Sequence, residues 1–229
     1  MNATLHVAIR DPFGSETLEM SSDATDTSLA GIALCGGQSR RMGRPKYSLA
    51  FGSETTLQRV VRSISQVTGR IVVVGMEGID WPEFTLPVTT SIDPSPYPGP
   101  LAALVQGFET LPDSVSHVLL TACDFPLISP GFLKKLVEQR NPRDDIIVVQ
   151  EETFPQPFAA VYQRSILPIA KSLLDKEERS LQALLTQCRT RFVPAEEFRD
   201  VDPMLHSLRN MNTMQDYQEL LRVAAGADQ

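Results

Sequence analysis

The sequence predicts an α/β fold: one three-layer α/β/α sandwich around a mainly parallel (mixed) β-sheet. From Leu29 onward, short apolar segments of strand length alternate with amphipathic segments of helix length, as in βα units. No second linker interrupts this alternation, and connections within compact domains are mostly short. The 229 residues are 42% apolar, which is enough for a sizeable core.

The sequence of the first part of the main domain predicts a strand, a helix and a second strand. Residues 31–37 (GIALCGG) form a buried strand, and residues 70–75 (RIVVVG) form the next. Between them, a helix from Thr55 to Val67 brings five apolar residues onto one face. These are Leu57, Val60, Val61, Ile64 and Val67.

The alternation continues to the end of the chain. A strand at 87–93 precedes a helix from Gly99 to about Leu111, and a strand at 117–124 precedes a helix from about Pro130 to Gln139. The remaining predicted strands are 145–150, 158–163 and 191–194, and the remaining helices are Ser165–Leu174, Ser180–Gln187 and a closing helix from Thr213.

The sequence divides into an N-terminal extension, residues 1–28, and a main domain at 29–229. The polar run Ser21–Ser28 is typical of a linker. Before it, alternating apolar residues at 5, 7 and 9 and a turn at 11–14 favour a β-hairpin, with a loosely attached tail as the alternative.

Composition excludes several classes of protein. The net charge is −7, so the chain does not coat nucleic acid, and no apolar run approaches the length of a membrane span. Three cysteines without CxxC spacing and three scattered histidines indicate neither a disulfide framework nor a zinc site. The first residues show neither a basic start nor an unbroken apolar stretch, so we expect a soluble, cytoplasmic protein with no nucleic-acid or membrane partner.

The segment 34–46 (LCGGQSRRMGRPK) carries the strongest functional signal. Gly36 and Gly37 end the first strand, where missing side chains let backbone N–H groups approach an anion. Four cations and no acid follow, against the sign of the whole chain: Arg40, Arg41, Arg44 and Lys46. Ligands of open α/β sheets bind at the carboxyl ends of strands, so a polyphosphate is indicated.

This segment is not one of the two common phosphate loops. A Walker A loop needs Ser or Thr after its Lys, whereas Tyr47 follows Lys46, and GxGxxG is absent. The ordinary alternative is a strand-to-loop turn with solvated arginines. The glycines, the four cations and the strand end together favour a phosphate site.

Two aspartates follow later strands at the same edge of the predicted sheet. Asp124 comes directly after the apolar strand at 117–123, and one carboxylate beside phosphates is sufficient for Mg²⁺. Asp93 occupies the equivalent place one strand earlier and could bind nucleotide or metal. The alternative for both is a turn or helix cap.

These motifs resemble the molybdenum cofactor guanylyltransferases. The segment 34–46 is similar to their LAGGxSxRMGxxK signature, and DPSPYPGPLAAL (93–104) to their Asp and PGPLAG segment. TACDFPLIS (121–129) resembles their metal-binding CDxP segment, and LRNMNTMQDY (208–217) their closing NxNTPxD segment. The resemblance runs from Leu29 to about Leu221 in the family's order.

The resemblance implies a nucleotide-diphospho-sugar transferase-like fold and roles for individual residues. Catalytic roles are implied for Lys46, Arg41 and Asp124, with Asp124 also the Mg²⁺ ligand. Nucleotide contacts are implied at Leu34, Cys35, Gly36, Gly37, Lys46, Asp93 and Asp124. Asn210 and Asn212 would bind the pterin, whereas their ordinary alternative is to start the closing helix, which Thr213 could also cap.

Two positions depart from the family pattern. Cys35 replaces the usual Ala, and Gly75 stands where some members carry a nucleotide-contacting Asn. The pocket around both positions should therefore differ in detail from the family's.

The function that the resemblance implies is transfer of GMP from GTP to the terminal phosphate of molybdopterin, with Mg²⁺ as cofactor and pyrophosphate as product. Carrier or delivery proteins for the molybdenum cofactor are implied as partners. The alternatives are a CTP-dependent molybdopterin cytidylyltransferase, another nucleotidyltransferase acting on a phosphorylated small molecule, and a non-catalytic nucleotide-binding module.

Overall fold

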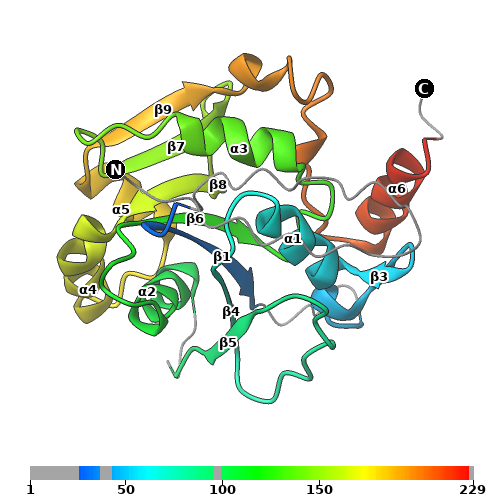
Figure 1. The fold of residues 1–229 in the computed structure, drawn as a ribbon, viewed down its shortest axis with the longest axis horizontal. Helices are drawn as coiled ribbons and strands as arrows, with labels where there is room; N and C mark the ends of the chain where they lie inside the picture. The colour runs from blue at the N-terminus through cyan, green and yellow to red at the C-terminus, as the bar shows by residue number, and fades with distance from the viewer. Residues whose placement is uncertain (1–25, 37–42, 95–98, 227–229) are drawn as a thin grey trace, which may run out of the picture.

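A seven-stranded sheet forms the centre of the molecule (Figure 1). The structure, a computed structural model of the chain, describes residues 26–36, 43–94 and 99–226. The strand order is β5-β4-β1-β6-β8-β7-β9. In that order the strands are Thr89–Ile92, Ile71–Gly75, Leu29–Cys35, His117–Ala122, Phe154–Gln163, Ile146–Glu151 and Thr190–Pro194.

The pairing confirms a mainly parallel, mixed sheet. Strands β5, β4, β1 and β6 run parallel to one another. Strand β8 is antiparallel to both β6 and β7, and β9 is parallel to β7. The carboxyl ends of β5, β4, β1 and β6 therefore meet at one edge of the sheet, which is the edge that the sequence predicted for the site.

Helices cover both faces of the sheet, as the three-layer prediction requires. On one face α1 (Thr56–Ser65) packs on β1 and contacts α3 (Pro130–Glu138), which packs on β8. On the other, α2 (Pro100–Thr110) packs on β4 and β1 and contacts α4 (Leu167–Asp175) and α5 (Leu181–Gln187). Packing on α1 is so close that a Cβ at Gly31 of β1 would lie 2.1 Å from Cγ2 of Ile64.

Side-chain caps explain where several helices begin. Thr55 accepts from the backbone of Gln58 and Gln58 reaches back, a capping box that starts α1. Ser129 and Ser180 cap α3 and α5 with a single bond each, accepting from the backbone of Phe132 and Ala183. The predicted helix at 165–174 differs, because a 3₁₀ turn at Arg164–Ile166 precedes α4.

Two hydrophobic cores hold these elements. The main core fills the space between the sheet and its helices. A small second core consists of the buried residues Leu49, Phe51, Met211 and Leu220, with Leu127, Tyr217 and Leu221 packed against them. The second core joins α6 (Met214–Ala224) to a hairpin of β2 (Ala50–Phe51) and β3 (Glu54–Thr55), which the sequence reading did not predict.

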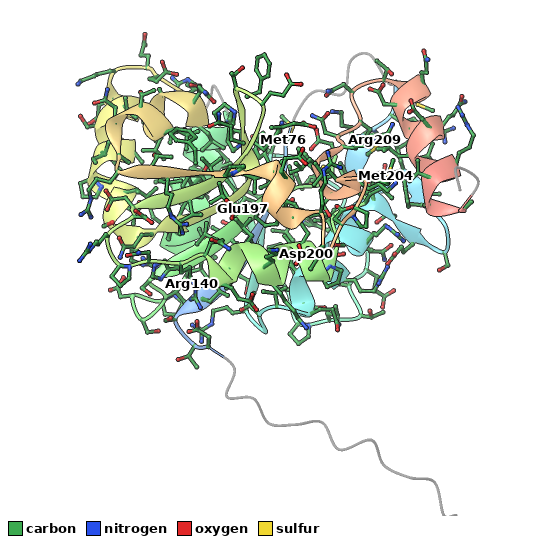
Figure 2. The ribbon with its side chains drawn as sticks, turned by 90° about the horizontal axis from the view of Figure 1, so that it is seen from above. Met76, Arg140, Glu197, Asp200, Met204 and Arg209 are labelled. Atoms are coloured by element: carbon green, nitrogen blue, oxygen red, sulfur yellow. The ribbon has the colours of Figure 1, made fainter. Side chains whose placement is uncertain are left out.

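The segment from β9 to α6 crosses α3 on its way to the second core. Glu197, Asp200, Met204 and Arg209 mark its course in Figure 2. Asp200 Oδ1 lies 2.5 Å from Lys135 Nζ on α3, and two short 3₁₀ turns lie within the segment at Ala195–Phe198 and His206–Leu208. These contacts fix the path by which Asn210 and Asn212 reach the sheet edge.

In the described ranges, no helix combines the length and the hydrophobicity that crossing a membrane requires. The predicted N-terminal hairpin and most of the linker lie outside the described residues.

Candidate active site

Three segments far apart in the sequence meet at the carboxyl edge of the sheet. Lys46 Nζ lies 3.1 Å from Asp124 Oδ2 and 3.0 Å from Asn212 Oδ1. Asn212 Nδ2 is in turn 3.4 Å from Asn210 Oδ1, a long contact. Four of the predicted site residues therefore form one connected polar group.

Lys46 begins a 3₁₀ turn, Lys46–Ser48, that follows Pro45. Its side chain is 19% exposed and that of Asp124 is 20% exposed, so solvent and a ligand can reach the pair. The carbonyl of Lys46 accepts a hydrogen bond from Thr56 Oγ1 at 2.6 Å. Helix α1 therefore fixes the backbone from which the ammonium group projects.

Asp124 lies two residues beyond the end of β6. The neighbouring Cys123 donates from its backbone to Leu34 O at 2.9 Å, which extends the β1–β6 pairing. The carbonyl of Asp124 accepts from the backbone of Met211 at 2.9 Å. The same hydrogen bond brings Asn210 and Asn212 to the carboxylate, because they flank Met211.

The closing helix does not use either asparagine as its cap. Thr213 is the N-cap residue of α6 and forms a capping box with Asp216. Asp216 Oδ2 also accepts from the backbone of Asn212 at 2.7 Å, and these N–H groups hold the pKa of Asp216 below its usual value. The cap role therefore leaves the amide of Asn212 available to Lys46.

The end of β1 combines a buried wall with open space. Leu34 and Cys35 are buried, whereas a Cβ placed on Gly36 would meet no atom of the described residues within 4 Å. Burial, together with the neighbouring thiol of Cys123, raises the pKa of Cys35 well above its usual value. Cys35 is thus a neutral, apolar part of the wall, and Gly36 leaves room for a ligand.

Asp93 lies at the far end of the same row of strand ends. Its side chain is largely buried, and its backbone N–H donates to Gly75 O at 2.8 Å. Strands β4 and β1 lie between β5 and β6, so Asp93 and Asp124 are about 14 Å apart at the usual spacing of about 4.8 Å per strand. They cannot both bind one metal ion directly, but an elongated ligand could contact both.

Gly75 differs from the family's asparagine for a steric reason. A Cβ at this position would lie 2.6 Å from Cη2 of Trp81 and 3.0 Å from Cδ1 of Ile79. Because the indole fills this space, a side chain at 75 would have to displace it. Trp81 therefore forms the wall beside the end of β4.

Gly37, Arg40 and Arg41 lie outside the described residues, so the structure does not place them. Arg44 is described and exposed. Of the predicted phosphate loop, the structure thus places the two ends, Gly36 and Lys46.

The oxygen atoms at the site suit a hard divalent cation. Among the described residues, no group of three or more His, Cys, Asp or Glu side chains could form a closed metal site. Mg²⁺ needs only one or two carboxylates when phosphate and water complete its shell. Asp124 fits that role, and its partner Lys46 also contacts the amide oxygen of Asn212.

Sequence reasoning missed the residues that support this polar group. Thr56 is fully buried and bonds Lys46, Arg59 bonds the turn after Asp124, and Tyr47 OH accepts from the backbone of Asp80 at 3.3 Å. The dipeptide Gly52-Ser53 is a turn signal that could have indicated the neighbouring β2–β3 hairpin, in which Gly52 has φ +71°.

The chain is similar to known nucleotidyltransferases in sequence and in fold. The family model of the MobA-like NTP transferase domain matches residues 31–192. A curated relative from Bacillus cytotoxicus, named "Probable molybdenum cofactor guanylyltransferase", is 32% identical over 197 residues, which cover 85% of this chain and 96% of the relative.

Solved structures with the same fold include proteins named for different nucleotides. Molybdopterin-guanine dinucleotide biosynthesis protein A from Archaeoglobus fulgidus has a TM-score of 0.72 at 19% identity, covering 86% of this chain and 99% of that one. A 4-diphosphocytidyl-2C-methyl-D-erythritol synthase from Anaerococcus prevotii has a TM-score of 0.62 at 10% identity, covering 86% and 98%. The nucleotide-diphospho-sugar transferase-like fold expected from the sequence is confirmed, and the fold alone does not select the base.

Proposed function

Because the chain belongs to the MobA-like NTP transferase family and is a nucleotidyltransferase, we propose that it transfers GMP from GTP to the terminal phosphate of molybdopterin. The observation that carries this proposal is the contact of Lys46 Nζ with both Asp124 Oδ2 and Asn212 Oδ1. It joins the phosphate loop, the metal-binding segment and the closing segment, the three parts that a nucleotide, a metal and an acceptor would need.

The reaction needs positioning and charge neutralisation rather than a general base. The nucleophile is a phosphate oxygen that is already ionised. It forms a bond to the α-phosphorus of GTP while the bond from that phosphorus to the β-phosphate oxygen breaks, and pyrophosphate leaves with the electron pair. The enzyme must overcome repulsion between two anions, and the ammonium group of Lys46 would supply the neutralising charge.

Asp124 would hold Mg²⁺, which supplies charge stabilisation on the reacting phosphates when bound. The ion pair with Lys46 keeps the carboxylate of Asp124 in place. Arg41 would add a second cation from the part of the loop that lies outside the described residues.

The row of strand ends gives the nucleotide its direction. Leu34, Cys35 and Gly36 present backbone groups at the end of β1, and Asp93 lies beyond them at the end of β5. A nucleotide lying along this row would have its base near β1 to β5 and its phosphates near Gly36 and Lys46. Asn210 and Asn212, on the other side of Lys46, would then face the pterin.

The catalytic domain would comprise residues 29–229, with 1–28 as an extension. Leu29 is where the main core begins, and α6 closes the site through the second core. A cytoplasmic location and delivery of the labile pterin by a carrier protein complete the proposal.

The decisive experiment measures pyrophosphate release with GTP, molybdopterin and Mg²⁺. The variant Asp124→Asn keeps the shape of the side chain and loses its charge, so we expect turnover to fall by about 100-fold or more, since metal-ion stabilisation is worth several kcal/mol. The control is Asp113→Asn, because Asp113 is a fully exposed carboxylate outside the site. Equal turnover in the two variants would contradict the assignment.

A competition between GTP and CTP in the same assay tests the base. A site that hydrogen-bonds a guanine edge leaves polar groups unpaired when cytosine enters, so we expect GTP to be preferred at least about 10-fold. A preference for CTP would replace the guanylyl assignment with the cytidylyl one. Absence of turnover with either nucleotide, despite binding, would favour the non-catalytic module.

A further inference from the structure

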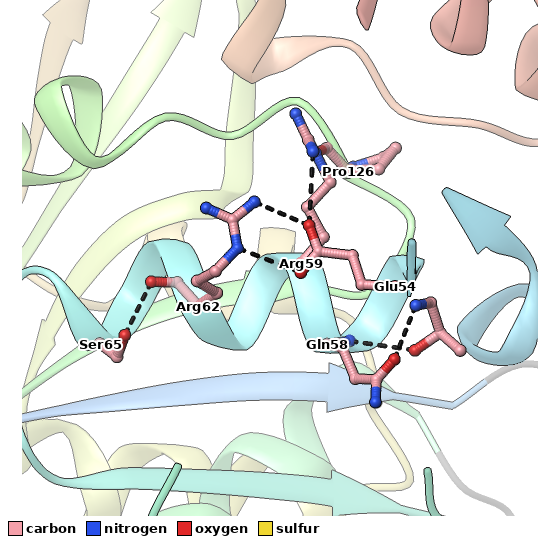
Figure 3. Close-up of polar contacts among 7 residues, drawn as sticks. Glu54, Gln58, Arg59, Arg62, Ser65 and Pro126 are labelled. Atoms are coloured by element: carbon pink, nitrogen blue, oxygen red, sulfur yellow. Dashed lines mark hydrogen bonds and ion pairs between the residues drawn. The ribbon is translucent and has the colours of Figure 1, made fainter. Parts of the chain in front are cut away.

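Helix α1 contacts the turn that carries Asp124. Arg59, one turn into the helix, donates from Nε to the carbonyl of Pro126 at 2.7 Å (Figure 3). Pro126 lies two residues beyond Asp124. A charged donor to a backbone carbonyl is worth more than a neutral one, so this is a strong tie between the helix and the turn.

The turn is packed by the buried side chains of Phe125 and Ile128, and its backbone accepts hydrogen bonds from two other segments. Its own backbone closes with Ile128 N donating to Phe125 O at 3.1 Å. From outside, Asp124 O accepts from the backbone of Met211, and Pro126 O accepts from Arg59. The bond from Arg59 is thus a side-chain hydrogen bond by which another element, α1, holds the backbone of the turn.

The orientation of Arg59 is fixed by its neighbours. Its guanidinium carbon lies 5.0 Å from the ring centroid of Phe51, a cation–π contact, and Nη1 lies 3.4 Å from Glu54 Oε1. Glu54 is held more closely by Arg62, whose Nη2 and Nε contact its two oxygens at 2.7 and 3.1 Å (Figure 3). Arg62 therefore binds both oxygens of the Glu54 carboxylate, and Nε of Arg59 donates to Pro126 O.

The same face of α1 also reaches the other half of the ion pair. Thr56 and Arg59 are three residues apart and so lie on one side of the helix. Thr56 Oγ1 donates to Lys46 O, while Arg59 donates to Pro126 O. One helix thus holds the backbone on both sides of the 3.1 Å contact between Lys46 and Asp124.

We propose that Arg59 is a positioning residue that holds the turn at Asp124 in the orientation that binds Mg²⁺ beside the phosphates of GTP. The part of this proposal that concerns Mg²⁺ and GTP rests on the function proposed above. Arg59 touches no reacting atom; it acts through the carbonyl of Pro126.

The test compares Arg59→Met with Arg62→Met. Both variants remove one guanidinium group from α1 and one partner of Glu54, but only the first removes the donor to Pro126. Arg59→Lys is a second variant, since it keeps a cation near Phe51 and loses the Nε donor. Two readouts are measured on the full chain: amide hydrogen exchange of a peptide covering Cys123 to Leu127, and calorimetric binding of GTP with and without Mg²⁺.

We expect exchange of that peptide to be faster by about 10-fold in Arg59→Met, as loss of one hydrogen bond to a charged donor predicts, and unchanged in Arg62→Met. GTP with Mg²⁺ should bind about 5- to 10-fold more weakly to Arg59→Met, whereas GTP without Mg²⁺ should bind equally. Arg59→Lys should change both readouts in the same direction.

Equal exchange in the Arg59 and Arg62 variants would overturn the proposal, and so would a loss of GTP affinity that does not depend on Mg²⁺. The exchange readout needs no catalysis. If the wild-type protein released no pyrophosphate, the proposed function would fail while the exchange data still decided whether Arg59 holds the turn.

Discussion

The main core and the second core differ in how they are built. The main core is made by whole elements: buried strands such as β1, in which all seven residues are buried, and helices with one apolar face. The second core is made by single residues from separate segments, such as Phe51 in the hairpin, Met211 before α6 and Leu220 within it. The first determines the fold, and the second lies directly behind the polar group of the site.

Because the two cores are built differently, the main core mainly supports the stability of the fold and the second core mainly supports the geometry of the site. Met211 is fully buried in the second core, and its backbone N–H holds Asp124 O while its neighbours are Asn210 and Asn212. Losing contacts in the second core should therefore disturb the site more than it disturbs the fold. Losing contacts deep in the main core should do the reverse.

The largest effect should come from truncating one side chain in each core. Phe108→Ala, in α2, should lower the free energy of unfolding by about 3–5 kcal/mol, because it opens a cavity in the main core. Met211→Ala should lower it by only about 2 kcal/mol, the low end for this substitution, because the smaller core can collapse around the gap. Turnover per folded molecule should fall about 10-fold or more in Met211→Ala alone, measured alongside chemical denaturation.

The control for this pair is Met204→Ala, in the same segment as Met211. Met204 is 69% exposed (Figure 2), so its loss should change neither stability nor turnover. If Phe108→Ala reduced turnover per folded molecule as much as Met211→Ala did, the division between the two cores would be wrong.

A smaller effect is expected from Thr56→Val at the start of α1. The substitution keeps the shape of a fully buried side chain and removes the hydroxyl that donates to Lys46 O. We expect a loss of about 0.5–1.5 kcal/mol in unfolding free energy, the net contribution of one hydrogen bond, because Lys46 O still accepts from the backbone of Leu49 at 3.2 Å. The KM for GTP should rise because the backbone of Lys46 loses its tie to α1.

Thr56→Ser is the matched control for this prediction, since it keeps the hydroxyl and removes a methyl group. Its KM for GTP should stay near the wild-type value. A rise in KM that is equal in the Ser and Val variants would mean that packing of the methyl group, not the hydrogen bond, positions Lys46.

The sequence predicted the main core well because periodicity reports whole elements. The parallel strands, the helices and the edge that carries the site follow from apolar runs such as residues 70–75 and from the helical face around Val60. The caps at Thr55 and Thr213 follow the same local rules.

The second core could not be predicted in this way. Phe51, Met211 and Leu220 are isolated apolar residues with no shared period, and only the folded chain brings them together. The same holds for Trp81, which packs against Gly75 after a loop, and for the hydrogen bond from Arg59 to Pro126 across 67 residues. Sequence motifs identified Lys46, Asp124, Asn210 and Asn212, and the residues that support them were visible only in the structure.

The smallest effect expected is a pH-dependent loosening at the start of α6. Asp216 accepts from the backbone N–H groups of Asn212 and Thr213, and these bonds lower its pKa below the ordinary value of 3.8. A group with a lowered pKa in the folded state contributes stability that is present above 3.8 and is lost as the pH falls through the folded value. Acid should therefore release Asn212 from its cap through Asp216.

Nuclear magnetic resonance of two backbone amides can compare the two regions directly. The amide of Asn212 reports on Asp216 beside the second core, and the amide of Arg189, which donates to Asp145 Oδ2 at 3.1 Å, reports on the β7–β9 side of the main sheet. The Arg189 side chain lowers the pKa of Asp145 to about 2. On acidification, the Asn212 amide should shift with a midpoint below 3.8, and the Arg189 amide with a midpoint near 2. In Asp216→Asn the first transition should vanish and the second should remain. A midpoint at or above 3.8 for Asn212 would mean that Asp216 does not cap the segment that brings Asn212 to Lys46.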